Sequence, residues 1–157
     1  MIQRIQTIWL LATTIVLLGL FVFPYVSYID LVGLGKKISV FGIYSSVNNE
    51  AVKEGSFLLQ AIATGLIALF PLFIIFQFRN RKRQIAFIFV EMALIVLLGV
   101  WMWATANSTL SAINQSVQAG NIGVGFFILP VAIILLSMAI GGIRKDEKLI
   151  KSADRLR

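Results

Sequence analysis

Side chains that could carry out chemistry are scarce in this sequence. Its 157 residues include no cysteine and no histidine. This excludes disulfides, thiolate nucleophiles, the commonest general base and metal sites built on Cys or His. Only seven residues are acidic, so a site built from carboxylates alone is poorly supplied. We therefore predict that the chain is not an enzyme and that it uses no metal and no cofactor.

One acidic residue, Glu91, lies inside a long apolar stretch. In a helix over 85–104 it would sit about 9 Å below the edge of the hydrocarbon, at about 1.5 Å per residue. A carboxylate at that depth costs a few kcal/mol, so Glu91 should face the interior of a helix bundle and find polar partners. Equal depth in other apolar stretches brings Thr13, Thr14 and Ser137 to this level. The sequence predicts an intramembrane polar layer of these four residues.

Two roles are open for Glu91. In the structural interpretation the carboxyl is protonated and donates a hydrogen bond across the bundle, which fixes the register of the helices. In the functional interpretation it binds a proton or a cation, as intramembrane carboxylates do in transporters. A single intramembrane acid with no basic residue beside it is too little equipment for a proton or ion pump. The structural interpretation is therefore favoured.

Four long apolar stretches must position these residues. The chain is 59% apolar and 13% charged, with a mean hydropathy of +0.91, whereas a soluble domain is about 45–50% apolar and about 25% charged. A membrane-spanning helix needs about 20 consecutive apolar residues. The sequence therefore predicts an all-α membrane protein, with residues 1–143 forming a bundle of four transmembrane helices. The predicted spans are 5–25, 57–78, 85–104 and 124–143.

The basic residues predict the orientation of the bundle. All but three of the 14 lie before the first span, between the second and third spans, or after the fourth. Cytoplasmic loops carry such an excess of Lys and Arg, so both termini should be cytoplasmic. The net charge of +7 then reflects membrane topology, and we predict no nucleic-acid partner. The three exceptions are Lys36, Lys37 and Lys53.

The first outer connection, Val26–Ser56, is the only long segment outside the spans. Alternating apolar and polar residues follow a glycine-rich stretch, and this pattern predicts a short β-hairpin. Its strands should lie near Tyr28–Val32 and Lys37–Tyr44. Because an isolated hairpin is marginally stable in water, it should rest on the membrane surface or on a partner.

Small residues at helical spacing indicate where helices can approach closely. Ala61, Gly65 and Ala68 form one stripe on the second span, and Gly141 lies one turn beyond Ser137 on the fourth. This spacing favours close helix packing. The neighbour could be a helix of the same chain or a helix of another protein.

Residues 144–157 form a basic tail that is predicted to be a cytoplasmic helix. Leu149, Ala153 and Leu156 give it a weak apolar stripe, and Gly141-Gly142 would let it swing away from the fourth span. It could dock onto a partner protein, or bind anionic lipid with about 1 kcal/mol per basic residue. The candidate docking residues are Arg144, Lys145, Lys148, Leu149, Lys151, Ala153, Arg155, Leu156 and Arg157.

The two ends of the chain carry a family resemblance. The segment Met1–Thr7, which reads MIQRIQT, and the segment Lys145–Arg157, which reads KDEKLIKSADRLR, resemble a family of small four-span inner-membrane proteins from Bacteroidota, catalogued as domain of unknown function 4293. The resemblance implies a bacterial inner membrane and no assigned enzyme activity. It carries over no catalytic residues.

Together these observations predict a non-catalytic accessory or scaffold subunit of a larger inner-membrane complex. The tail and the first outer loop would be its docking surfaces, and its host complex would serve protein export or envelope biogenesis. The alternative is a small homo-oligomeric transporter or channel that uses Glu91.

Overall fold

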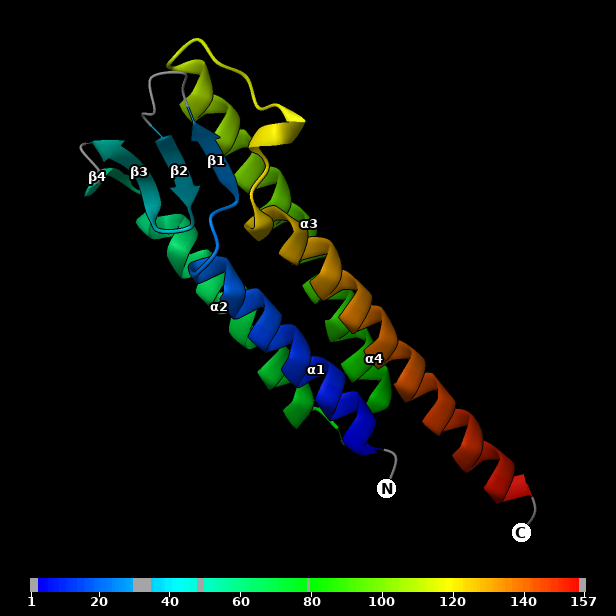
Figure 1. Ribbon diagram of the computed structural model, residues 1–157. Coiled ribbons are helices and arrows are strands. Elements are labelled where there is room, and N and C mark those ends of the chain that lie inside the picture. The colour runs from blue at the N-terminus through cyan, green and yellow to red at the C-terminus, as the bar shows by residue number, and fades with distance from the viewer. Residues whose placement is uncertain (1–2, 30–34, 48–49, 79, 156–157) are drawn as a thin grey trace.

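Four α-helices and a small antiparallel sheet make up the fold (Figure 1). The structure is a computed structural model, and it describes residues 3–29, 35–47, 50–78 and 80–155. The helical elements are α1 (Gln3–Leu18), the 3-10 turn η1 (Gly19–Phe21), α2 (Leu58–Phe76), α3 (Arg81–Ser111), the 3-10 turn η2 (Ala119–Asn121) and α4 (Val124–Arg155).

The helices lie side by side along one long axis, as Figure 1 shows. Helix α1 packs against α2 and α4, and α3 packs against the same two neighbours, so α1 and α3 face each other diagonally. Among the described residues, three helices are long and apolar enough to cross a membrane, and the apolar segment Ile5–Phe21 is shorter. The expected spans over 57–78, 85–104 and 124–143 therefore correspond to three long apolar helices.

The first apolar helix ends before the predicted limit at residue 25. The backbone tightens into η1 after Leu18, where the amide groups of Val22 and Phe23 both donate to the carbonyl oxygen of Gly19. Pro24 has no N–H to donate and disfavours helical geometry in the residue before it, so the helix cannot continue through it. The chain leaves the helix there and enters the sheet.

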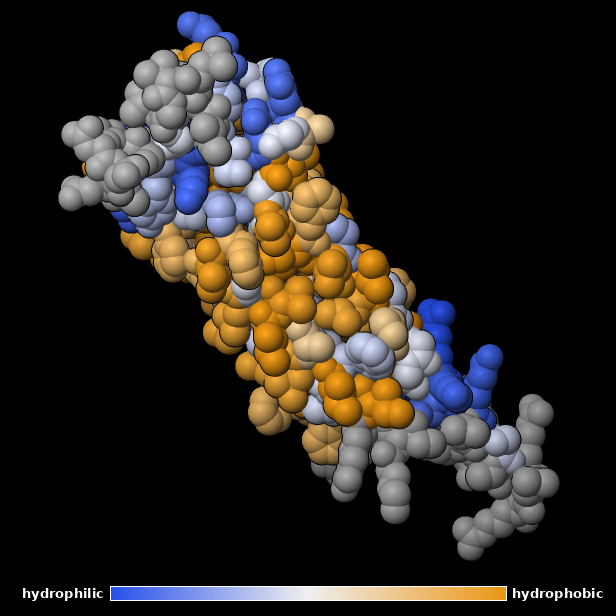
Figure 2. Space-filling view, in the orientation of Figure 1, coloured by the Kyte–Doolittle hydropathy of each residue, from blue (hydrophilic) through white to orange (hydrophobic). Residues whose placement is uncertain are grey.

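The core of the bundle is a set of buried helix faces. On α3 the buried side chains recur every three or four residues, from Gln84 through Ile88, Glu91 and Ile95 to Leu110. This is the spacing of one face of an α-helix. Outside the core, hydrophobic residues cover the middle of the helices and hydrophilic residues gather at the two ends (Figure 2). The surface therefore has the apolar belt of a protein that sits in lipid.

The first long connection forms a four-stranded antiparallel sheet in the order β1-β2-β3-β4. The sequence predicted a hairpin in this place, and the prediction was wrong in extent. The stretch Lys37–Tyr44 is not one strand, because the chain turns at Val40 and Phe41. The first predicted strand ends at Ile29, and the rest of it lies outside the described residues. The strands are β1 (Val26–Ile29), β2 (Gly35–Ser39), β3 (Gly42–Val47) and β4 (Glu50–Ser56).

Gly42 explains how a turn can interrupt that alternating pattern. Its φ is +147°, and a Cβ at this position would lie 1.9 Å from the carbonyl oxygen of Gly55. Only glycine fits this backbone and this close approach. Val40 and Phe41 are not typical turn residues, so the alternation concealed the turn.

The sheet is joined to the bundle through the start of α4. The amide of Gly123 donates to the carbonyl oxygen of Tyr25 at 2.9 Å, and that of Gly125 donates to Pro24 at 3.0 Å. A Cβ at Gly123 would lie 2.3 Å from the Pro24 oxygen. Backbone therefore packs directly on backbone here, and this contact defines the sheet end of the bundle. The opposite end, where α1 begins and α4 ends, is the terminal end (Figure 1).

Candidate functional site

Glu91 lies on the core-facing side of α3. Its side chain is 0% exposed, and within the described residues neither carboxyl oxygen has a hydrogen-bond partner. Buried polar atoms in proteins are nearly always partnered, so such a group calls for an explanation. It is the first candidate for a functional residue.

Contacts between α2 and α3 show which residues lie level with Glu91. The Gln84 side-chain amide donates to the carbonyl oxygen of Ile74 at 3.5 Å. The two helices are antiparallel, so seven residues forward along α3 from Gln84 reach the same level as seven residues back along α2 from Ile74. These positions are Glu91 and Ile67. The buried residue of α2 at that level is Ala68.

The same reasoning applies to α3 and α4. A Cβ on Gly99 would lie 3.1 Å from the Leu129 side chain, so the two residues mark one level. Equal steps in opposite directions lead to Glu91 and Ser137. Leu136 is fully buried there, whereas Ser137 is exposed and donates to the carbonyl oxygen of Ile133 at 2.9 Å. Ser137 thus lies at the predicted depth but points away from the core.

Thr13 and Thr14 are buried on α1, as the predicted polar layer requires. Their hydroxyls, however, donate to carbonyl oxygens of their own helix: Thr13 to Trp9 at 2.9 Å and Thr14 to Leu10 at 3.3 Å. Neither hydroxyl bonds to Glu91. Within the described residues, the predicted polar layer therefore forms no hydrogen-bond network with Glu91.

A second group of buried polar residues extends from Glu91 toward the sheet end. Gln60 and Thr64 are buried on α2, two turns and one turn before Ala68, respectively. Their side-chain polar atoms have no hydrogen-bond partner among the described residues. The Tyr25 hydroxyl lies beside the Gln60 side chain but does not meet hydrogen-bond geometry. Sequence reasoning missed this group. Its signal was two polar residues spaced by four in an otherwise apolar helix.

The predicted packing stripe lies beside this group on α2. A Cβ on Gly65 would lie 3.8 Å from the Phe21 ring, so Gly65 packs within the chain against η1. Ala61 is half-buried and Ala68 is fully buried. On α4 the close contact belongs to Gly142, whose added Cβ would meet the Gln6 side chain at 3.2 Å, whereas Gly141 faces open space.

A second buried carboxyl, Asp146, lies at the terminal end. It is 4% exposed, and its Oδ2 atom accepts a hydrogen bond from the side-chain amide of Gln6, which is also buried. This bond joins the start of α1 to α4 across most of the length of the sequence. The sequence offered one signal for it, since Asp146 follows the buried Ile143 at helical spacing.

Beyond Asp146, α4 continues as one unbroken helix and projects past the other helices (Figure 1). It runs straight through Gly141 and Gly142. The candidate docking residues Arg144, Lys145 and Lys148 are exposed. The side chains of Leu149, Lys151, Ala153 and Arg155 lie outside the described part of the structure, as do residues Leu156 and Arg157 as a whole.

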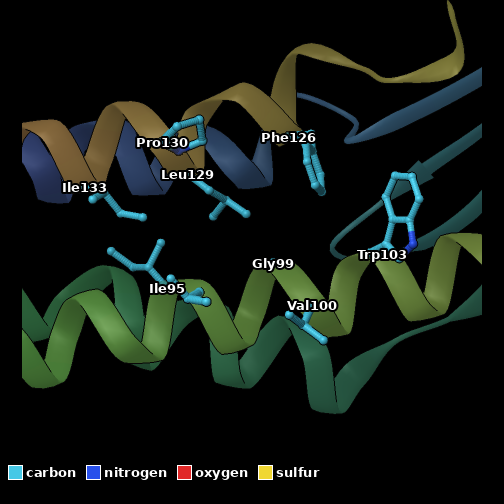
Figure 3. Close-up of a pocket in the computed structure, with 9 residues that line it drawn as sticks. Ile95, Gly99, Val100, Trp103, Phe126, Leu129, Pro130 and Ile133 are labelled. Atoms are coloured by element: carbon cyan, nitrogen blue, oxygen red, sulfur yellow. The ribbon is translucent and has the colours of Figure 1, made fainter. Parts of the chain in front are cut away.

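An apolar groove of about 370 Å³ lies between α3 and α4. Figure 3 shows Ile95, Leu129 and Ile133 in the space between the two helices, with Trp103 and Phe126 toward the sheet end. The ring centroids of Trp103 and Phe126 are 6.1 Å apart. The groove holds no ionisable side chain, so it offers no acid, base or nucleophile.

Within the described part of the sheet, one ion pair joins charged side chains. Lys36 Nζ lies 2.9 Å from Glu54 Oε2 and joins β2 to β4. The hydrogen bond from Lys36 lowers the pKa of Glu54. Among the residues that the structure describes, no three acidic side chains gather into a group that could hold a metal ion.

A family model described as Domain of unknown function (DUF4293) matches residues 2–156, which is nearly the whole chain. No curated protein matches the chain.

Proposed function

Since the chain belongs to the family described as Domain of unknown function (DUF4293), we propose a function from its geometry, its charge pattern and the resemblance of its two ends. The protein is a non-catalytic accessory or scaffold subunit that docks onto a larger complex in the bacterial inner membrane of a Bacteroidota species. The projecting, cationic end of α4 is the observation that carries this proposal.

The proposal includes four membrane crossings with both termini in the cytoplasm. Helix α1 has 16 residues and η1 adds three, which together span about 30 Å at about 1.5–2 Å per residue. That length matches a hydrocarbon core of about 30 Å. The excess of basic residues at the terminal end supports a cytoplasmic location of this end.

The hydrogen bond between Gln6 and Asp146 supports docking by a rigid helix. It ties α4 to α1 at the point where α4 leaves the bundle, so the projecting turns have a fixed direction. A rigid surface loses less conformational entropy on binding than a flexible one. Because Asp146 is buried in this contact, the cations Arg144, Lys145 and Lys148 dominate the exposed start of the extension. They suit an acidic protein surface, and we propose a host complex in protein export or envelope biogenesis.

The test is site-specific photocrosslinking in the native membrane. A photoreactive residue at position 148 should give a protein adduct of defined mass. The triple variant Arg144→Gln, Lys145→Gln with Lys151→Gln should weaken that adduct. The matched control places the photoreactive residue at position 82, beside exposed cations at the same end of the bundle, and should not give this adduct. Lipid adducts alone at position 148, or the same adduct from both positions, would reject the docking role.

A second candidate function rests on Glu91, whose two oxygens are buried without a partner in the described residues. In this proposal the chain forms a homo-oligomeric transporter or channel, and Glu91 binds a proton or a cation. Purified protein in liposomes should then carry a proton-linked flux that Glu91→Gln abolishes and Ser137→Ala, at the same depth on the lipid-facing side, preserves. Equal flux in the native protein and in Glu91→Gln would reject this candidate.

A further inference from the structure

We propose that the bundle core contains a hydrated polar track that starts at the sheet end and stops at Glu91. Its ligand is water, and through water it delivers protons to the Glu91 carboxyl from the sheet side. The inference deepens the second candidate function, since it states which side would supply Glu91. The track requires only that water enters the core, whereas the transport proposal requires a net flux of protons or cations across the membrane.

The buried face of α2 changes character halfway along the helix. In the half toward the sheet it carries Gln60, Thr64 and Ala68, and in the half toward the termini it carries Pro71 and Ile74. Residues four apart lie one above the other on a helix. The polar side chains therefore form a row along the core on one side of Ala68 only.

Glu91 stands at the end of this row. It lies on α3 at the level of Ala68, one turn of α2 beyond Thr64. Three consecutive positions therefore carry polar atoms without a protein partner in the described residues: the Gln60 amide, the Thr64 hydroxyl and both Glu91 oxygens. These atoms belong to two helices that pack against each other. The proposed track joins them along one path, and the unpartnered Oδ1 atom of Asp146, at the terminal end, lies outside it.

Water is the partner that such a row requires. A buried polar group without a partner costs about 1–3 kcal/mol, so several of them in one row would be a heavy cost for a small bundle. Buried water molecules typically satisfy otherwise unpaired groups of this kind and make about three hydrogen bonds each. A chain of water molecules that bonds Gln60, Thr64 and Glu91 in turn reduces this cost but does not abolish it, because ordering the water costs entropy. Apolar residues at these three positions would also have avoided the desolvation cost, but the sequence has polar residues there.

The two ends of the path differ in polarity, and this difference sets the direction of access. Toward the termini, the next buried residues after Glu91 on α3 and after Ala68 on α2 are Ile88 and Pro71. The buried Gln84 follows one turn beyond Ile88, and its side-chain amide donates to the carbonyl oxygen of Ile74. Toward the sheet, Gln60 lies in the first turn of α2, and Tyr25 directly precedes β1. The row of unpartnered polar groups therefore reaches the sheet end of the bundle, whereas the apolar layer of Ile88 and Pro71 separates Glu91 from the buried polar residues of the terminal end.

The layer around Glu91 limits what the track can bind. Ala68 of α2, Leu136 of α4 and the Thr13 and Thr14 hydroxyls of α1 lie at or near its level, and none of these side chains is ionisable. A metal cation would need several oxygen ligands, and one carboxyl among these residues does not supply them. Water and protons are the ligands that remain.

Cysteine accessibility tests the inference, and the natural chain suits the method because it has no cysteine. Thr64→Cys and Ile74→Cys lie on the same buried face of α2, in its two different halves. A small, charged, membrane-impermeant thiol reagent is added to the sheet side of protein in sealed vesicles. Thr64→Cys should react at least about tenfold faster than Ile74→Cys, since thiols react as thiolates, which form where water is present.

A third variant separates hydration from simple exposure. Ser137→Cys is exposed on the outer surface of α4 at the depth of Glu91, so in the bilayer it contacts lipid and should react as slowly as Ile74→Cys. Equal rates for Thr64→Cys and Ile74→Cys would overturn the track. A faster reaction of Thr64→Cys from the terminal side would overturn its direction.

A measurement on the unmodified side chains covers the case in which Thr64→Cys does not fold. The infrared carbonyl band of Glu91, identified by its loss in Glu91→Gln, should shift within seconds when the full-length protein in liposomes is moved into heavy water. A band that stays unshifted for hours would overturn the inference. Rapid exchange without any proton flux would keep the track and reject the transport proposal, so the two failures are distinguishable.

Discussion

The two buried carboxyls of the bundle differ in one respect, and the difference separates a structural role from an available site. Asp146 at the terminal end accepts a hydrogen bond from Gln6. Glu91 in the middle of the core accepts none from any described residue. A partnered buried carboxyl holds two helices together, whereas an unpartnered one lowers stability. Residues that break the rules of stable packing without a visible gain are commonly functional.

The strongest test of this comparison is the loss of the partnered acid. Asp146→Leu should lower the free energy of unfolding by about 1–3 kcal/mol, because it leaves the buried Gln6 amide without its acceptor. Asp146→Asn keeps a carbonyl oxygen for Gln6 and should lose less. Equilibrium unfolding in mixed micelles measures both. If Asp146→Leu unfolds no more easily than the native protein, the bond does not fasten the helices.

Replacing Glu91 with an apolar residue should change the free energy of unfolding in the opposite direction. Glu91→Met replaces a buried carboxyl that has no protein partner in the described residues, and at most water, with an apolar side chain of similar volume. It should raise the free energy of unfolding by about 1–2 kcal/mol. Glu91→Gln keeps a polar group at the site and should gain little. The unfolding assay is the same as for Asp146. A loss of stability in Glu91→Met would show that the carboxyl has a structural partner after all.

Two neighbouring glycines offer a finer test of the Gln6 contact. Gly142→Ala places a methyl group 3.2 Å from the Gln6 side chain, whereas Gly141→Ala points into open space. Alanine favours a helix over glycine by roughly 0.5–1 kcal/mol, and only Gly141→Ala should show this gain in full. The difference in free energy of unfolding between the two variants should approach about 1 kcal/mol. Identical effects would mean that Gln6 moves aside at no cost.

The smallest expected effect concerns an acid that is neither buried nor alone. Lys36 donates to Glu54 and lowers its pKa, so the pair stabilises the sheet above the unfolded pKa of Glu, which is about 4.3. That contribution disappears as the pH falls through the lower folded pKa. NMR titration of the Glu54 carboxyl should show the low pKa, and Lys36→Gln should move it upward. An unchanged Glu54 titration in Lys36→Gln would contradict the role of the pair.

The helices were the most predictable part of the fold. Long apolar stretches can only be satisfied as helices when water is absent, because the helix pairs its own backbone groups. The cost of placing a carboxylate in lipid at that depth also indicated a core position for Glu91. The sheet was less predictable: alternation located it, but the turn at Val40–Phe41 depends on Gly42 meeting the backbone of Gly55, which lies on another strand. Such a contact leaves no mark in a local pattern.

The candidate site shows the same division between what is local and what is not. Depth along a helix follows from counting residues, so the level shared by Glu91, Thr13 and Ser137 could be estimated from the sequence. The rotation of each helix about its axis could not, since one residue corresponds to about 100° of turn. Leu136 therefore occupies the core position where the sequence had suggested Ser137.

By itself, the sequence determined the apolar helices, the excess of cations at one end and the presence of one acid in the core. These properties depend on composition and on spacing within a single segment. Only the tertiary structure decided that Gln6 meets Asp146 and that Gln60 and Thr64 lie in line with Glu91. Those pairings depend on how separate helices rotate and slide against each other, and between lipid-embedded helices close packing and hydrogen bonds set that arrangement in place of a general hydrophobic force.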